Sequence, residues 1–232
     1  MLLAQRWLDL TFLHWRVDPG LVTPLLPAGT VPDVLDGQTW VGLVPFRMQR
    51  LRPGNGPAIP WLGTFPETNV RLYSVDATGR RGVVFRSLDA ARLAVVLGAR
   101  ALLGLPYMWS RMRVRRVGGE IEYAAARRFP GPAGVGGRIR VRPGREIARP
   151  DPLADFLTAR WGLHTRVRGR TLYLPNHHEP WPLQTASVTR LDTGLLAAAG
   201  LTGPAGRPPD SVLFSPGVSV VFGRPFDAAR PG

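Results

Sequence analysis

The strongest constraint on the fold is a regular alternation of side chains over residues 65–73, which read FPETNVRLY. Successive side chains of a β-strand point to opposite faces of the sheet, so a strand here places the larger polar residues on one face, about 7 Å apart. They are Glu67, Asn69, Arg71 and Tyr73. An acid, an amide, a guanidinium and a phenol in one row predict a wall of a polar cavity.

The same pattern is also typical of an ordinary strand that faces solvent on one side and the core on the other. The stretch alone leaves these two interpretations equally open. A loop rich in proline and glycine, residues 52–60, precedes the strand. Such a loop is not expected to continue a strand, and we predict that it forms a rim or lid over a cavity.

Turn signals divide the rest of the chain into roughly eight or nine strands, most of them joined as hairpins. Three short helices are also expected, each after an aspartate that can cap it. They cover residues 19–26, 90–103 and 152–161, after Asp18, Asp89 and Asp151. No linker divides the chain. We therefore predict a single domain over residues 1–232, of the β-rich α+β class, with antiparallel strands forming a sheet or barrel.

All 30 basic residues are arginine, and the chain contains neither lysine nor cysteine. Without lysine, no Schiff base to a side-chain amine can form. Without cysteine, thiolate nucleophiles, disulfides and cysteine–zinc sites are excluded. The formal net charge of +14 is compatible with nucleic-acid binding. Because the arginines are spread along the chain, however, a compositional bias explains them better.

No segment is predicted to cross a membrane, because the longest apolar stretch, residues 93–109, is interrupted by Arg100 and Pro106. The N-terminus lacks the charged and apolar regions of a secretory signal. Together with the absence of cysteine, these features predict a cytoplasmic protein. The sequence leaves open whether it forms a homo-oligomer.

A second group of candidate residues lies in residues 177–182, which read HHEPWP. Adjacent side chains of an extended chain point to opposite sides, so only one of His177 and His178 can join Glu67 in a cavity. A histidine–carboxylate pair suits acid–base chemistry, because imidazole titrates near neutral pH. No metal site is expected, since the chain holds only 4 histidines. The alternative is a rigid proline-rich loop in which Trp181 and one histidine only pack.

Several short stretches, taken in order, carry a family resemblance. They are residues 13–18 (LHWRVD), 40–46 (WVGLVPF), 65–73 (FPETNVRLY), 87–90 (SLDA), 105–107 (LPY) and 177–183 (HHEPWPL). Together they resemble the YqjF-like family of bacterial proteins of unknown function, and the resemblance extends over almost the whole chain. Each stretch alone is not specific, but their order is.

The YqjF-like family is related to acetoacetate decarboxylase, so the resemblance implies a cone-like or double antiparallel β-barrel around a small polar cavity. The decarboxylase carries its Schiff-base lysine in a Gly-x-Pro-Lys motif. Here Gly104, Leu105 and Pro106 are followed by Tyr107. Decarboxylation through an amine is therefore excluded on chemical grounds, and a shared fold does not carry the activity with it.

The residues and the resemblance together favour binding of a small anionic or carbonyl-bearing ligand, with no cofactor. For an enzyme of the lyase or isomerase type, we expect Glu67 to act as acid or base and Tyr107 to donate a hydrogen bond to a developing oxyanion. Arg71 or Arg86 is expected to hold a carboxylate. A proton relay is assigned to His178 or His177. The other candidate ligand-binding residues are Asn69, Tyr73, Arg111 and Trp181.

Two other functions compete with this hypothesis. The same cavity could serve a non-catalytic sensor or binding protein. An arginine-rich nucleic-acid binder is less favoured, because the arginine-bearing strands lack the interleaved aromatic residues of a stacking platform.

Overall fold

The computed structural model describes residues 1–229, and within them all 13 strands belong to one sheet. The strands are β1 (Leu3–Val17), β2 (Thr30–Pro32), β3 (Thr39–Pro53), β4 (Phe65–Asp76), β5 (Arg81–Ala90), β6 (Tyr107–Val117), β7 (Glu120–Phe129), β8 (Gly136–Glu146), β9 (Gly162–Val167), β10 (Arg170–His178), β11 (Gln184–Thr193), β12 (Ser211–Phe222) and β13 (Phe226–Asp227). The helical segments are α1 (Pro19–Val22), η1 (Thr23–Leu25), α2 (Leu93–Leu103), α3 (Pro152–Thr158), α4 (Leu195–Ala198) and α5 (Thr202–Ala205). The predicted β-rich fold with a few short helices is confirmed.

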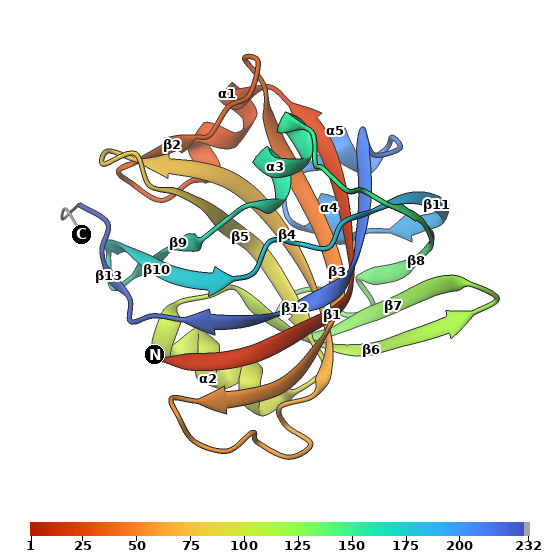
Figure 1. Cartoon of the computed structure of the whole chain (residues 1–232). Coiled ribbons are helices and arrows are strands. Elements are labelled where there is room, and N and C mark those ends of the chain that lie inside the picture. Colours follow the sequence, from red (N-terminus) through yellow and green to blue (C-terminus); the bar gives the residue numbers. More distant parts are fainter. Residues whose placement is uncertain (230–232) are drawn as a thin grey trace.

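Hydrogen-bonded strand neighbours can be followed around two closed circuits (Figure 1). The first runs β10–β9–β5–β4–β3–β1–β12 and returns to β10. The second runs β5–β6–β7–β8–β11–β12–β1–β3–β4 and returns to β5. Most pairs are antiparallel, but β5 pairs in parallel with both β6 and β9. The two circuits share β12, β1, β3, β4 and β5, so each of these strands has a core on either face.

Strand β4 shows this arrangement most clearly. Val70 and Leu72 pack into a core cluster with residues of β7 and β8. Tyr73 faces the other way, into a cluster with residues of α2, α3 and β10. The charged side chains of Glu67 and Arg71 are buried as well. The alternation over residues 65–73 is therefore real, but neither face meets bulk solvent, and the interpretation as an ordinary solvated strand is wrong.

The N-terminal strand β1 changes the face it presents at Asp9. This residue has a positive φ of 51°, and the pairing of β1 with β3 shifts register between Leu8 and Leu13. The carboxylate of Asp9 is held by Arg47 and Arg116. Because a bulge inserts one residue, the side chains that point inward change from odd-numbered to even-numbered positions.

A second bulge lies in β5. Val70 of β4 is opposite Ser87, whereas the next residue, Arg71, is opposite Phe85. Arg86 therefore has no partner in the pairing with β4, and its side chain reaches the carbonyl oxygen of Ala199 at 3.4 Å.

The helix caps are correctly predicted at two of three positions. Asp18 accepts a hydrogen bond from the backbone N–H of Gly20, and Asp151 accepts one from Ala154. The predicted cap at Asp89 is wrong, because α2 begins at Leu93 and Arg92 precedes it without a side-chain cap.

Asp89 instead remains in β5 and forms a buried ion pair with Arg127 of β7. Its two carboxylate oxygens accept from the guanidinium at 2.8 and 3.0 Å, and Ser110 of β6 donates at 2.6 Å. The physical reason is that the bidentate contact with a buried guanidinium stabilises this carboxylate more than a single hydrogen bond at an exposed helix N-terminus would. Asp89 thereby joins β5, β6 and β7.

Among residues 1–229, no helix is long and apolar enough to cross a bilayer.

Candidate ligand-binding cavity

A cavity of about 470 Å³ lies among the strands of the first circuit. Strands β1, β3, β4, β5, β9, β10 and β12 line it, together with Arg160, α2, the last residue of α3 and the first residue of β6. The proline-rich loop after β3 contributes Ile59 and Leu62 to the lining. Figure 1 shows this loop and α2 together at the end of the molecule where β1 begins. The cavity volume falls in the range of small-molecule sites.

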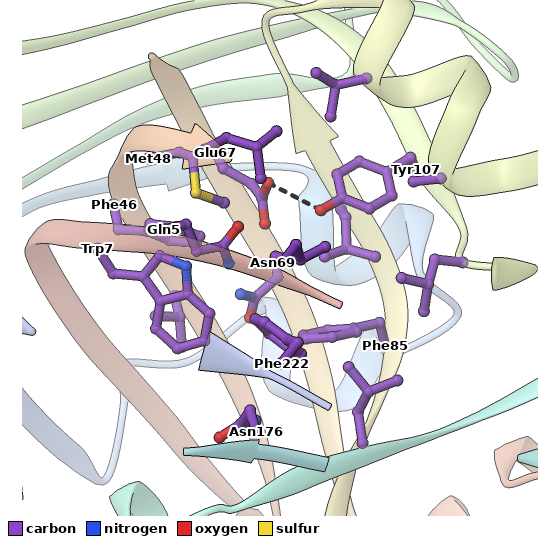
Figure 2. Close-up of a pocket in the computed structure, with 18 of the residues that line it drawn as sticks. Gln5, Trp7, Phe46, Met48, Glu67, Asn69, Phe85, Tyr107, Asn176 and Phe222 are labelled. Carbon is purple, nitrogen blue, oxygen red and sulfur yellow. Dashed lines mark hydrogen bonds between the residues drawn. The ribbon is translucent and has the colours of Figure 1, made fainter. Parts of the chain in front are cut away.

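Most of the wall is apolar, which differs from the polar cavity that the resemblance implies. Aromatic rings form much of it, including Trp7, Phe46, Phe85 and Phe222 (Figure 2). The reason is that this circuit also encloses one of the two hydrophobic cores. Polar side chains occur only at a few places along the wall.

Glu67 and Tyr107 form the best-defined polar contact. The Tyr107 hydroxyl donates to Glu67 Oε2 at 3.1 Å (Figure 2), and Glu67 is only 3% exposed. Burial raises the pKa of Glu67 from 4.5 to about 8, and the charge of Asp89 adds to this, while the Tyr107 hydrogen bond lowers it. Burial also raises the pKa of Tyr107 well above 10.0. At neutral pH the pair is therefore uncharged.

The segment before Tyr107 explains how this side chain reaches Glu67. Gly104 ends α2 with a positive φ of 62°, and a Cβ there would lie 2.5 Å from the carbonyl oxygen of Arg166. Only glycine fits this turn. The chain then enters β6, where Tyr107 is opposite Leu88 of β5 in a parallel pairing.

Arg71 lies farther along β4, about 13 Å from Glu67 between Cα atoms, as expected for four residues of a strand. It donates to the Tyr73 hydroxyl at 3.1 Å and to the Leu157 carbonyl oxygen at 2.9 Å. Its guanidinium also lies 5.5 Å from the centre of the Phe12 ring. Arg71 is buried, yet no carboxylate among residues 1–229 forms an ion pair with it. This end of the cavity is electropositive.

The positive charge near Arg71 affects a histidine that the sequence had not singled out as a cavity residue. His14 is fully buried and its Nε2 lies 2.6 Å from the Tyr73 hydroxyl. Burial, together with the charges of Arg71 and Arg160, lowers the pKa of His14 well below 6.5. His14 is therefore neutral at pH 7 and adds no further positive charge beside Arg71.

Of the two adjacent histidines, only His178 lines the cavity. It is buried between the rings of Trp161 and Trp181, whose centres lie 4.6 and 4.7 Å away. Burial lowers its pKa, although the carbonyl oxygen of Glu179 opposes this. His177 is exposed. The prediction that the two side chains point to opposite sides is therefore confirmed.

The predicted site residues fall into two groups. Six of them line the cavity, namely Glu67, Asn69, Arg71, Tyr107, His178 and Trp181. The other four lie elsewhere: Tyr73 is buried behind Arg71, Arg86 points to α4, and Arg111 and His177 are exposed. Within the described residues, no group of three histidine, aspartate or glutamate side chains lies close enough to hold a metal ion.

Most of the lining residues were missed by the sequence analysis. Those with a hydrogen-bonding side chain are Gln5, Trp7, Thr158, Arg160 and Asn176. Gln5 and Trp7 alternate on β1, which is the signal that could have identified them, but the bulge at Asp9 interrupts this alternation. Asn176 directly precedes the two histidines, and no local pattern distinguishes it from a loop residue.

The fold is that of acetoacetate decarboxylase-like proteins. An acetoacetate decarboxylase-like enzyme from Sphingomonas wittichii RW1 superimposes with a TM-score of 0.65 and 15% identity, over 97% of this chain and 92% of that one. The enduracididine biosynthesis enzyme MppR complexed with pyruvate gives 0.64 and 15%, over 99% and 91%. The acetoacetate decarboxylase from Legionella pneumophila gives 0.59 and 14%, over 96% and 86%. At such identities the similarity shows the fold alone.

The sequence comparisons are more specific. Residues 4–219 match the model of the DUF2071 family, which is described as an uncharacterized conserved protein. The uncharacterized protein YqjF of Bacillus subtilis (strain 168) is 35% identical over 207 residues, which are 89% of this chain and 85% of that protein. The chain therefore belongs to the DUF2071 family, and the predicted resemblance to YqjF is confirmed.

Proposed function

We propose that the protein binds a small carbonyl-bearing or anionic molecule in this cavity and transfers a proton to or from it without a cofactor. The observation that carries the proposal is the buried Glu67–Tyr107 pair facing the cavity. A solved structure of similar fold, that of MppR, is complexed with pyruvate, which agrees with a carbonyl-bearing ligand.

The properties of Glu67 suit this role. A general acid or base works best when its pKa lies near the working pH. Burial brings the pKa of Glu67 to about 8, so the protonated form can donate to a carbonyl oxygen, and its conjugate base can remove a proton from the adjacent carbon. In the second case Tyr107, released from Glu67, would keep its proton and donate a hydrogen bond to the enolate oxygen that develops.

Arg71 supports an anionic group on the ligand. A buried guanidinium without a carboxylate partner is costly, and a bound carboxylate would offset that cost. Its separation of about 13 Å from Glu67 along β4 favours a ligand longer than a three-carbon keto acid. An isomerase or lyase reaction would then take place at the Glu67 end of the molecule.

The competing proposal is a non-catalytic binding protein that uses the same cavity. The mainly apolar walls favour it, because they supply binding energy without a second catalytic group beside Glu67. Nucleic-acid binding is favoured less. In β8, Arg140 and Arg142 already pair with Glu122 and Glu120 of the neighbouring strand, at 2.6 and 2.7 Å.

We also propose that the two strand circuits form the cone-like double barrel implied by the family resemblance. Their closed pairing supports this. The cavity would then be the interior of the first barrel.

Proton transfer can be tested by following deuterium incorporation next to the carbonyl of added keto acids and aryl ketones in D₂O by NMR. We expect the wild-type protein to accelerate exchange of at least one of them, and Glu67→Gln to slow it by about 100-fold or more. The control is Glu146→Gln, which changes an exposed glutamate and should exchange like the wild type. Ligand binding without any exchange would favour the non-catalytic proposal, and neither binding nor exchange would contradict both.

A further inference from the structure

Several polar groups on the cavity wall have no hydrogen-bond partner. Trp7 Nε1, Asn69 Oδ1 and Asn176 Oδ1 are buried and unpaired, and all three residues line the cavity. The side chain of Gln5 also makes no hydrogen bond within residues 1–229, although Gln5 is only 8% exposed. Buried polar groups in folded proteins almost always have partners, and each unpaired one costs about 1–3 kcal/mol. Three such atoms on residues that line one cavity, together with the unpaired amide of Gln5, therefore indicate a ligand that supplies the partners.

These groups come from strands that lie together in the first circuit. Trp7 and Gln5 belong to β1. Strand β1 pairs with β12, and β12 pairs with β10, which carries Asn176. Asn69 projects from β4, on the same face as Glu67. Figure 2 shows the amide of Gln5 between Glu67 and Asn69, with the indole N–H of Trp7 beside them. Asn69 is 6% exposed, and neither atom of its amide has a hydrogen-bond partner among residues 1–229.

The chemistry of the unpaired atoms restricts what can satisfy them. The indole N–H of Trp7 is a donor only, whereas Asn69 Oδ1 and Asn176 Oδ1 are acceptors. A carboxylate has acceptors but no donor, so it could pair with Trp7 but would leave the amide oxygens unpaired. A ketone likewise has an acceptor but no donor, so it would also leave the amide oxygens unpaired. A ligand that presents an N–H and a C=O side by side can satisfy donors and acceptors together.

The walls around these groups suit a flat molecule. Trp7 stacks on Trp181 at 6.0 Å between ring centres and packs against Phe46 and Phe222. Phe85 adds a further ring to the lining. At about 30 Å³ per water molecule, the cavity has room for about 15 waters, which is enough for one or two fused rings.

We propose that the ligand is a planar aromatic molecule with an uncharged amide edge, such as an aryl carboxamide or a ring lactam, which forms hydrogen bonds with Gln5, Trp7 and Asn69. The inference rests on the proposed function, because it requires a ligand in this cavity. It narrows the binding part of that proposal by assigning the carbonyl of the ligand to an amide, and it does not involve the proton transfer, because an aryl carboxamide has no hydrogen on the carbon next to its carbonyl.

Three probes of nearly equal size separate the alternatives. Benzamide has the amide edge, benzoate has a carboxylate, and acetophenone has a carbonyl without a donor. We expect benzamide to bind the wild-type protein at least 10-fold more tightly than either of the others in calorimetric titrations, because a site with buried hydrogen-bonding groups rejects analogues that cannot pair with them. Isoquinolin-1-one, a fused ring lactam, should bind at least as tightly as benzamide.

Two variants test which atoms make the distinction. Asn69→Leu removes the amide at nearly constant volume, and Trp7→Phe removes the N–H while keeping an aromatic ring. Each should reduce benzamide binding about 10-fold or more and change acetophenone binding much less. Retention of acetophenone binding by either variant also shows that it has folded.

The outcomes distinguish this inference from the proposed function. Preference for benzoate, lost in Arg71→Gln, would overturn the amide inference and leave the anion-binding form of the proposed function intact. Equal binding of acetophenone and benzamide would overturn the inference and leave a carbonyl site. Binding of none of the four probes would overturn the inference, and the proposed function would then depend on the keto acids of the exchange experiment.

Discussion

Two carboxylates at opposite ends of β4 have similarly low solvent exposure but opposite properties. Glu67 and Asp76 are 3% and 6% exposed. The pKa of Glu67 is raised to about 8, mainly by burial. Burial acts in the same direction on Asp76, but hydrogen bonds from Thr78 and Arg80 outweigh it and bring its pKa well below 3.8. Low exposure therefore does not by itself decide whether a buried acid is charged.

The difference lies in the partners that each carboxylate has. Asp76 accepts from the backbone and hydroxyl of Thr78 and from the backbone and guanidinium of Arg80, at 2.7–3.1 Å. These donors stabilise the charged form and fix the turn between β4 and β5. Within the described part of the chain, Glu67 accepts only from Tyr107, and it otherwise faces the cavity. The structure thus holds Asp76 in its charged form. Glu67, in contrast, can gain or lose a proton, and the fold does not depend on that proton.

The largest expected effect comes from neutralising Asp76. Asp76→Asn removes the charge that pairs with Arg80 and leaves a buried site short of an acceptor, so it should lower the free energy of unfolding by about 4 kcal/mol at pH 7. Urea denaturation would measure this. The exposed pair of Asp192 and Arg190 provides the control, because Asp192→Asn should change stability by less than about 1 kcal/mol.

The pH dependence of the Asp76 effect has a definite sign. A depressed pKa contributes stability above the unfolded value of 3.8 and loses it as pH falls below that value. The difference between wild type and Asp76→Asn should therefore shrink in acid. An Asp76→Asn variant as stable as the wild type at pH 7 would show that the two carboxylates do not differ as described.

The next largest effect is the reverse pH dependence of Glu67. Its pKa is raised from 4.5 to about 8, so the folded protein holds a proton that the unfolded chain releases between these values. Wild-type stability should then fall relative to Glu67→Gln as pH rises from 4.5, by about 3 kcal/mol at pH 7. Unfolding of both proteins across this pH range is the measurement. Parallel stability curves would contradict a neutral Glu67.

The smallest effect sharpens the role of Tyr107. Its hydrogen bond lowers the pKa of Glu67, so Tyr107→Phe should raise that pKa further. The expected change corresponds to about 1 kcal/mol in the free energy of ionising Glu67. The infrared C=O band of a protonated carboxyl group, followed as a function of pH, reports this titration. Tyr123→Phe is the matched control, since Tyr123 is a buried tyrosine that donates to the Asp9 backbone. The same shift in both variants would argue against a specific Tyr107 contact.

The sequence by itself determined the features that depend on neighbouring residues or on composition. The alternation over residues 65–73 placed Glu67, Asn69 and Arg71 on one face, and adjacency separated His177 from His178. The absence of lysine excluded Schiff-base chemistry without any structure. These inferences succeeded because strand periodicity and residue chemistry are local properties.

Only the tertiary structure decided which residues surround Glu67. The bulges at Asp9 and Arg86 change the face of β1 and β5, which brings Trp7 to the cavity and turns Arg86 away. Asp89 became an ion-pair partner instead of a helix cap because the guanidinium of Arg127, 38 residues away, reaches its carboxylate. Bulges and buried ion pairs arise from contacts between strands that are distant in sequence, so no local pattern announces them.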